Sequence, residues 1–286
     1  MQKIVDKSFE YLSKLSALLV LVVLVTIFWV LFEEAKPAIE AFGVEFLTNS
    51  KWAPNLEIFG GAPAIFGSVV STFLAMIIAT PIAIGIAIFL TEIAFEKLKT
   101  PIGTAIEMLA AIPSIIYGMW GLFYFAPIIR DWFGGNGLGL LTAGIVLSIM
   151  ILPFMAAITR DSMNTTPDIL KESAYALGAT KWDVIKDVVI PYAKAGIIGS
   201  IILALGRAIG ETMAVTFVMG NVHKIPDSIV NAATSIPVTL ANEFTEADGD
   251  LYYASLFYLA LILFVISFVV IATAKFYFLR KIRKER

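Results

Sequence analysis

The chain of 286 residues is dominated by apolar side chains, since 59% of its residues are hydrophobic and only 15% are charged. Its mean hydropathy is +0.86, whereas soluble globular domains carry roughly 25% charged residues. The chain has no cysteine and one histidine, His223, which excludes a disulfide framework, thiolate chemistry and the usual clusters of metal ligands. The net charge of -2 gives no sign of nucleic-acid binding. We therefore expect an integral membrane protein without a metal or a cofactor.

Six apolar runs are long enough to cross a bilayer, which takes about 20 helical residues. They extend over about 15–32, 64–90, 102–129, 138–159, 195–219 and 251–274. The first run lacks the small-residue cleavage site of a secretory signal peptide, so we expect it to remain as a transmembrane helix. The expected fold class is all-α, a polytopic membrane protein with about six transmembrane helices.

The lysine and arginine side chains divide unequally between the two sides of this arrangement. Both termini, the second loop and the loop between the fourth and fifth runs hold sixteen of them. The opposite loops hold four, which are Lys36, Lys51, Arg130 and Lys224. The positive-inside rule then predicts a multi-pass membrane protein with both termini in the cytoplasm.

A polar segment, 171–196, separates the fourth and fifth apolar runs. Gly178 can end a helix in the left-handed conformation, and Thr180 followed by Asp183 resembles a capping box. We expect two short amphipathic helices, the second ending before Pro191. Because both are too short to span a membrane, they would form a cytoplasmic knob that a soluble partner could bind.

The same segment resembles the EAA loop of ABC importer permeases, in which E-A-A, three residues, G, nine residues and I-x-L-P follow one another. The chain keeps the glutamate, glycine and proline in register and makes conservative replacements at Ser173, Val188 and Ile190. In that family the loop inserts into a groove on the ATPase subunit. The resemblance implies that docking to an ABC ATPase dimer uses Glu172, Ala174, Leu177, Gly178, Ala179, Thr180 and Pro191. The alternative is an ordinary amphipathic cytoplasmic loop.

The fifth apolar run contains two charged residues, Arg207 and Glu211. On a continuous helix they lie one turn apart on one face, beside a stripe of small residues. An ion at the centre of a membrane helix costs about 2.5 to 3.5 kcal/mol on a translocon scale, so the pair must face protein, water or each other. We expect both residues in a substrate pathway; the alternative is an internal salt bridge that only neutralises itself.

The third run contains Ser114 and Tyr117 directly after Pro113. Their hydroxyl groups lie at membrane depth and could line a polar path for a substrate. The alternative for Ser114 is a hydrogen bond to its own backbone. We expect a structural role for Glu107 and a solvated position for His223.

The run from Leu205 to Val215, with Gly220 and Asn221, resembles the signature of the phosphate-specific (Pst) ABC permeases, in the form of their C-type subunit. The A-type subunit tends to continue G-E-T-A-P, where this chain reads GETMA. The resemblance implies a type I ABC importer permease architecture, a location in the cytoplasmic (inner) membrane and inorganic phosphate as substrate. It also implies four partners: the ATPase dimer, an A-type permease in a heterodimer, an extracytoplasmic phosphate-binding protein and membrane lipid.

The chain has no Walker A sequence, so ATP hydrolysis is expected on a separate partner chain and the protein is expected not to be an enzyme. We divide it into an N-terminal helix and outer loop (1–63), a permease core (64–274) with the docking loop at 160–195, and a basic cytoplasmic tail (275–286). The alternatives are a permease for another oxyanion such as sulfate or molybdate, a secondary anion transporter or channel, and a membrane enzyme. The last would need more ionisable groups in the spans.

Overall fold

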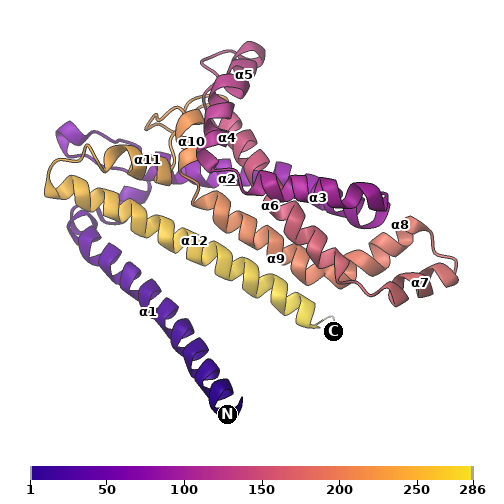
Figure 1. Ribbon diagram of the computed structural model, residues 1–286. Helices are drawn as coiled ribbons and strands as arrows, with labels where there is room; N and C mark the ends of the chain where they lie inside the picture. Colours follow the sequence, from indigo (N-terminus) through magenta and orange to yellow (C-terminus); the bar gives the residue numbers. More distant parts are fainter. Residues whose placement is uncertain (1, 285–286) are drawn as a thin grey trace.

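A computed structural model describes residues 2–284, and the side chains of 6–276 within them; of the basic tail, 285–286 lie outside the described residues. The described part is all-α, with two isolated β-bridges in its connections (Figure 1). The α-helices are α1 (Gln2–Phe42), α2 (Ala62–Ile88), α3 (Glu96–Ala110), α4 (Ser114–Trp120), α5 (Ala126–Phe133), α6 (Leu140–Asn164), α7 (Asp168–Ala176), α8 (Lys181–Val184), α9 (Ile190–Ile209), α10 (Met213–Val218), α11 (Ile236–Glu243) and α12 (Asp250–Lys284). The π-helical turns are Phe89–Ile93, Gly121–Phe125 and Ile185–Val189, and the 3-10 turns are Gly43–Leu47 and Pro54–Leu56.

Several helices are long and apolar enough to cross a membrane. Within the described residues these are Asp6–Leu47, Ala62–Ile93, Leu140–Asn164, Lys181–Ile209 and Asp250–Phe276. The pair Glu96–Ala110 and Ser114–Phe133 adds a sixth crossing if it is one span, bent by 90°. The all-α fold with about six transmembrane helices is therefore confirmed.

The third span is broken, whereas the sequence predicted a continuous helix over 102–129. Pro113 has no backbone N–H and disfavours the helical conformation of Ile112, so α3 ends at Ala110 and α4 begins at Ser114. The hydroxyl of Tyr117 then donates a hydrogen bond of 2.8 Å to the carbonyl oxygen of Leu109 across the break. The break divides the predicted span over 102–129 into two helices, and the bend turns α4 away from α3 (Figure 1).

The centre of the core is the contact between α2 and α6, which cross closely because their facing residues are small. Ala75, Ala79 and Ala83 of α2 are fully buried. A Cβ atom added to Gly144 of α6 would lie 2.8 Å from the Cβ of Leu74. Close backbone approach supplies the packing between membrane helices, since lipid gives no hydrophobic driving force.

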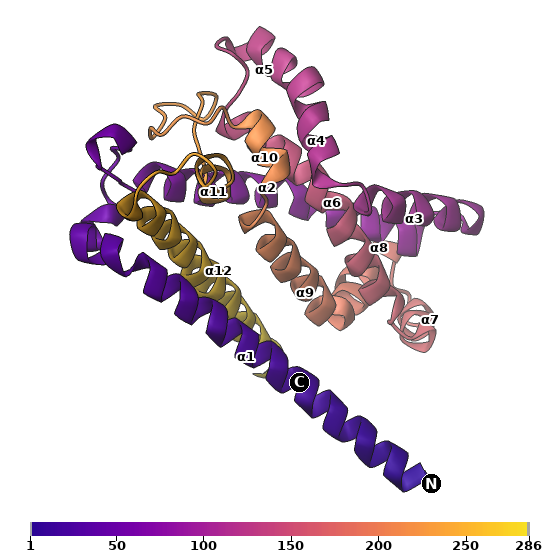
Figure 2. The same ribbon diagram turned by 60° about the vertical axis from the view of Figure 1, so that its left-hand side comes forward.

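Helices α1 and α12 lie side by side at the edge of the molecule (Figures 1 and 2). The rings of Phe28 and Phe264 pack with centroids 5.9 Å apart. Residues 6–30 of α1 are exposed, as expected for a helix that faces lipid. In both views the start of α1 and the end of α12 lie toward the same end of the molecule as α7 and α8.

A polar cluster holds the opposite end together around the carboxylate of Glu243, at the end of α11. Trp52 Nε1 donates a hydrogen bond of 2.8 Å to it, the Tyr252 hydroxyl donates another, and His223 Nε2 lies 2.8 Å from its second oxygen. The rings of Trp52 and His223 also stack with centroids 5.3 Å apart. The expectation of a solvated His223 was therefore wrong, because its side chain is only 20% exposed. Burial opposes ionisation of Glu243, but the hydrogen bonds from His223, Tyr252 and Trp52 outweigh it and hold the pKa of Glu243 below its ordinary value.

Candidate functional site: a docking segment and an interrupted membrane helix

Helices α7 and α8 with the turn between them (168–184) form the docking segment. Helix α7 ends as the sequence predicted, because Gly178 adopts a φ of +87°, a conformation that costs a glycine little. The N–H of Gly178 donates to the Tyr175 carbonyl oxygen at 2.9 Å, and that of Ala179 to the Ala174 carbonyl at 3.1 Å. The last carbonyl groups of α7 are thereby satisfied, and the chain reverses within a few residues.

The predicted capping box at the start of α8 is confirmed. The N–H of Thr180 donates to Asp183 Oδ2 at 2.9 Å, and the N–H of Asp183 donates to Thr180 Oγ1 at 3.4 Å. These two bonds satisfy backbone donors that a helix start leaves unpaired. They fix the direction in which α8 leaves the turn.

The sequence predicts that the second helix of the segment ends before Pro191, and this prediction was wrong. Instead, α8 passes through the π-helical turn Ile185–Val189 into α9, as one span over Lys181–Ile209. The N–H of Ile190 donates to the carbonyl of Ile185, five residues back. The wide turn accommodates Pro191 at the start of α9, where a missing N–H costs little. Helix α8 is thus continuous with a membrane-spanning helix.

Apolar side chains cover the outer surface of the docking segment. Leu177 is 89% exposed, and Ile169, Tyr175 and Trp182 are also exposed. An apolar patch of this kind on a polar segment indicates a protein-binding surface. Of the predicted docking residues, Glu172, Leu177, Gly178 and Thr180 lie on this exposed surface, and Pro191 is exposed further along, at the start of α9. Ala174 and Ala179 are half-buried and pack against the cluster of buried side chains beneath the segment.

The helix that carries Arg207 is interrupted. Helix α9 ends at Ile209, Gly210 has φ -92° and ψ 4°, and α10 begins at Met213. The prediction of Arg207 and Glu211 on one face of a continuous helix was therefore wrong. Gly206 and Gly210 weaken the helix here, and the carboxylate of Glu211 accepts a hydrogen bond of 3.1 Å from the N–H of Ala214. Glu211 thus caps the start of a new helix.

Arg207 lies in the last turn of α9, where the carbonyl ends of the helix favour a positive charge. Its guanidinium lies 5.7 Å from the ring centroid of Phe154, on α6, and its side chain is exposed. A cation over an aromatic face is stabilised without being neutralised. Arg207 therefore keeps a positive charge that is available to bind an anion. Sequence spacing alone did not indicate its contact with Phe154.

Helix α4 packs tightly against α10 and brings Tyr117 to this interruption. A Cβ atom on Gly118 would lie 2.8 Å from the Cα of Ala214, so the two backbones are almost in contact. Tyr117 is buried and within electrostatic range of Arg207. The hydroxyl of Tyr117 is hydrogen-bonded across the bend between α3 and α4. Ser114 lies half-buried in the first turn of α4. The structure thus gathers Tyr117 and Arg207 near the interruption, with Glu211 just beyond it.

Residues 83–284 match the family model of the binding-protein-dependent transport system inner membrane component. The phosphate transport system permease protein PstC of Mesorhizobium japonicum is 48% identical, over 96% of this chain and 90% of that protein. The PstC of Pasteurella multocida is 47% identical, over 99% of this chain and 94% of that protein. The chain thus matches these relatives over nearly its whole length.

Solved structures show the same fold at lower identity. A bacterial alginate ABC transporter in complex with a pentasaccharide-bound periplasmic protein aligns with a TM-score of 0.61 and 15% identity, over 90% of this chain and 92% of that one. The inward-facing MetNI methionine ABC transporter aligns with a TM-score of 0.58 and 19% identity, over 77% of this chain and 94% of that one. The family match and the relatives show that the protein is a multi-pass transport component of the inner membrane and not an enzyme. The chain belongs to the binding-protein-dependent transport system inner membrane component family of ABC importer permeases, among its PstC-like members.

Proposed function

We propose that the chain is the permease subunit of an ABC importer for inorganic phosphate and forms one half of its translocation pathway. The observation that carries this proposal is the identity of 47–48% with two phosphate transport permeases, which the chain matches over 90% and 94% of their lengths. Identity at this level over whole chains favours a common substrate as well as a common fold.

The docking segment couples the permease to ATP hydrolysis on a partner ATPase dimer. Leu177, Ile169 and Trp182 give it an exposed apolar surface that fits a groove on a protein partner. Because α8 runs on into α9, closure of the ATPase dimer moves a membrane-spanning helix directly. This movement converts an outward-facing cavity into an inward-facing one.

Arg207 provides the positive charge that an anion needs in a low-dielectric medium. Arginine keeps its proton under ordinary conditions, and its fork of donors matches phosphate oxygens. The ring of Phe154, with its centroid 5.7 Å from the guanidinium, stabilises the cation while no anion is bound. Glu211 follows after the interruption and prevents the anion from being held too firmly. Ser114 and Tyr117 of α4 contribute to the wall of the pathway.

The complete importer contains a second permease of the A type, two ATPase subunits and an extracytoplasmic phosphate-binding protein that delivers the anion to the outer loops. Both termini and the docking segment face the cytoplasm. The charge distribution supports this orientation, since sixteen of the 21 lysines and arginines fall in loops assigned to that side.

Reconstitution tests this proposal. The complex purified with its associated subunits is placed in proteoliposomes with ATP at the ATPase side and the binding protein with radiolabelled phosphate on the other. We expect uptake that requires ATP and that excess sulfate or molybdate leaves unchanged. Uptake driven by an ion gradient without ATP would indicate a secondary transporter, and strong competition by sulfate would indicate a different oxyanion permease.

A further inference from the structure

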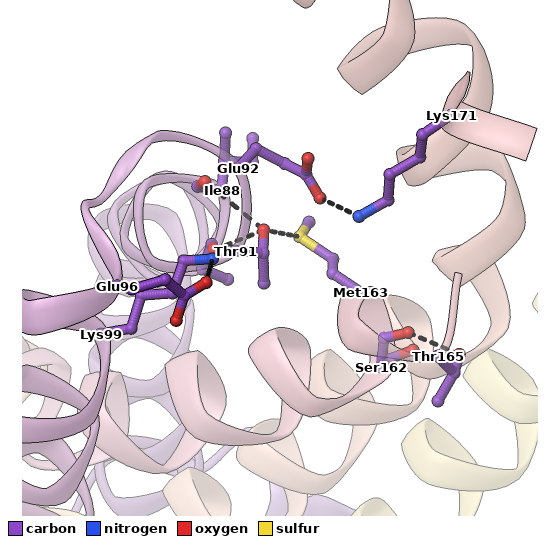
Figure 3. A network of polar contacts seen from close by, with 10 residues as sticks. Ile88, Thr91, Glu92, Glu96, Lys99, Ser162, Met163, Thr165 and Lys171 are labelled. Carbon is purple, nitrogen blue, oxygen red and sulfur yellow. Dashed lines mark hydrogen bonds and ion pairs between the residues drawn. The ribbon is translucent and has the colours of Figure 1, made fainter. Parts of the chain in front are cut away.

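An ion pair joins the docking segment to the end of α2. Lys171 Nζ on α7 lies 2.7 Å from Glu92 Oε1, and the two side chains are only 18% and 8% exposed. Figure 3 shows them reaching toward each other from the two elements. Loss of one partner would leave an uncompensated charge in a largely buried site, which costs more than the loss of an exposed ion pair.

Glu92 is held firmly in relation to the membrane core. It lies in the π-helical turn Phe89–Ile93, which prolongs α2 and which the N–H of Ala94 closes by donating to Phe89 at 2.7 Å. The adjacent Thr91 donates to the carbonyl of Ala87 at 3.0 Å, and its hydroxyl lies 3.9 Å from the sulfur of Met163 on α6 (Figure 3). The carboxylate of Glu92 therefore moves with α2 and α6.

Helix α7 also packs against α8 and the π-helical turn Ile185–Val189, with Ala174 against the cluster beneath the segment. None of the residues of α7 is buried, and its large apolar side chains Ile169 and Leu170 are exposed. The ion pair of Lys171 with Glu92 attaches α7 to a different element, the end of α2.

We propose that Glu92 and Lys171 form the mechanical link that passes a displacement of α7 to α2. This inference rests on the proposed docking of the segment to an ATPase. The link acts in parallel with the covalent connection from α8 to α9. Helix α2 packs along α6, and α6 carries Phe154 over Arg207, so a displacement of α2 reaches the pathway through closely packed side chains. Both are positioning residues, because neither contacts the anion.

Charge neutralisation and charge exchange test this link in the reconstituted complex. The variants are Glu92→Gln, Lys171→Met and the double exchange Glu92→Lys with Lys171→Glu. The control is Lys99→Gln, since Lys99 pairs within α3 with Glu96 and connects no two elements. The measurements are co-purification of the ATPase and the amount of phosphate transported per ATP hydrolysed.

We expect each neutralised variant to retain the ATPase but to transport about fivefold less phosphate per ATP, a factor typical of a lost coupling interaction. The exchange should recover part of this loss, and the control should match the wild type. Unchanged transport per ATP in both neutralised variants would overturn the proposal. An exchange variant that assembles but recovers nothing would also count against it.

A distance measurement separates this link from the identity of the substrate. The chain has no cysteine, so spin labels can be placed at the exposed positions Asp168 at the start of α7 and Ile82 on α2. In the wild type, trapping the ATPase with vanadate should leave their separation unchanged, because α2 follows α7. In Glu92→Gln the separation should change. If the distance between the labels changed as much in the wild type as in Glu92→Gln, the link would be refuted. If the distance changed only in Glu92→Gln, but the complex took up no phosphate, the link would stand and the proposed substrate would be refuted.

Discussion

Arg207 has the environment of a cation that is stabilised but left unneutralised. The carbonyl end of α9 and the ring of Phe154 favour its charge, whereas the carboxylate of Glu211 is engaged by the backbone of α10. A substitution at Arg207 therefore removes a charge without leaving a buried carboxylate unpaired. Its effect on transport can be measured separately from any effect on folding.

We predict that Arg207→Gln abolishes phosphate uptake while the complex still assembles. Without the cation, an anion entering the low-dielectric pathway has no compensating charge, and uptake should fall at least tenfold, or about 1.4 kcal/mol. Arg207→Lys, which keeps the charge, should retain part of the activity. Lys36→Gln, on the exposed side of α1, is the control; uptake by Arg207→Gln at the wild-type rate would make Arg207 a structural residue.

Glu243 gives a second prediction, which concerns pH. Because the pKa of Glu243 is lowered below its ordinary value of 4.5, the stability that its ionised form contributes is present above pH 4.5. It is lost as the pH falls through the lowered pKa. The protection factors for hydrogen exchange in the segments around Trp52 and His223, which correct for the intrinsic pH dependence of amide exchange, should therefore fall in the wild type below pH 4.5.

In the variant Glu243→Gln, the backbone amides of these segments should already exchange faster at pH 7 than in the wild type. The expected loss of local stability is about 2 kcal/mol, which is typical of hydrogen bonds to a charged group. The variant should lack the acid-dependent step. Glu246→Gln, at an exposed position nearby, should behave as the wild type. An unaltered acid-dependent step in Glu243→Gln would mean that another group is responsible.

The two kinds of contact at the residue scale differ in how far the sequence could predict them. Thr180 and Asp183 lie three residues apart, and Gly178 closes a local turn, so sequence spacing was sufficient. Glu92 and Lys171 are 79 residues apart, and Trp52 and Glu243 are 191 apart. In one sequence nothing connects such residues, because their pairing depends on how the helices pack.

At the scale of elements, hydropathy located the membrane helices but not their interruptions. The mean hydropathy of an apolar run is the same whether or not the helix bends within it. Apart from Pro113 itself, the sequence therefore carried no sign of the 90° bend. The glycines at 206 and 210 were interpreted as a packing stripe, which is the other common use of small residues in membrane helices. Gly206 does allow close packing, since a Cβ atom there would lie 3.1 Å from Cδ1 of Ile271 on α12. Gly210 instead lies at the interruption, just before the residue that accepts a hydrogen bond from α10.

The docking segment carries a prediction at this scale. Leu177→Asp should prevent co-purification of the ATPase but leave the isolated permease as stable as the wild type, because Leu177 is 89% exposed and contributes little to folding. We expect at least a tenfold loss of affinity, or about 1.4 kcal/mol. Leu56→Asp, at an exposed position of the segment between α1 and α2, is the matched control. Normal ATPase binding by Leu177→Asp would exclude Leu177 from the docking surface.

The orientation of the whole molecule is a further prediction. Single cysteines can be introduced without removing others, and exposed positions are available at Lys181 in α8 and Asn136 in the loop after α5. A membrane-impermeant thiol reagent should label position 136 from outside intact cells, and position 181 only after the membrane is opened. The reverse pattern would invert the topology that the charge distribution predicts.

The pairing of α1 with α12 (Figure 2) has a consequence for biosynthesis. Of the described helices, α1 is made before the others and packs against α12, with Phe28 and Phe264 in contact. At ordinary elongation rates of about 5–20 residues per second, α1 waits roughly 10–45 s for its partner to be made. During that interval the newly inserted α1 must persist in lipid as an independent helix, which its long apolar stretch allows. A nascent chain interrupted before α12 would display this unpaired helix to the quality-control proteases of the membrane.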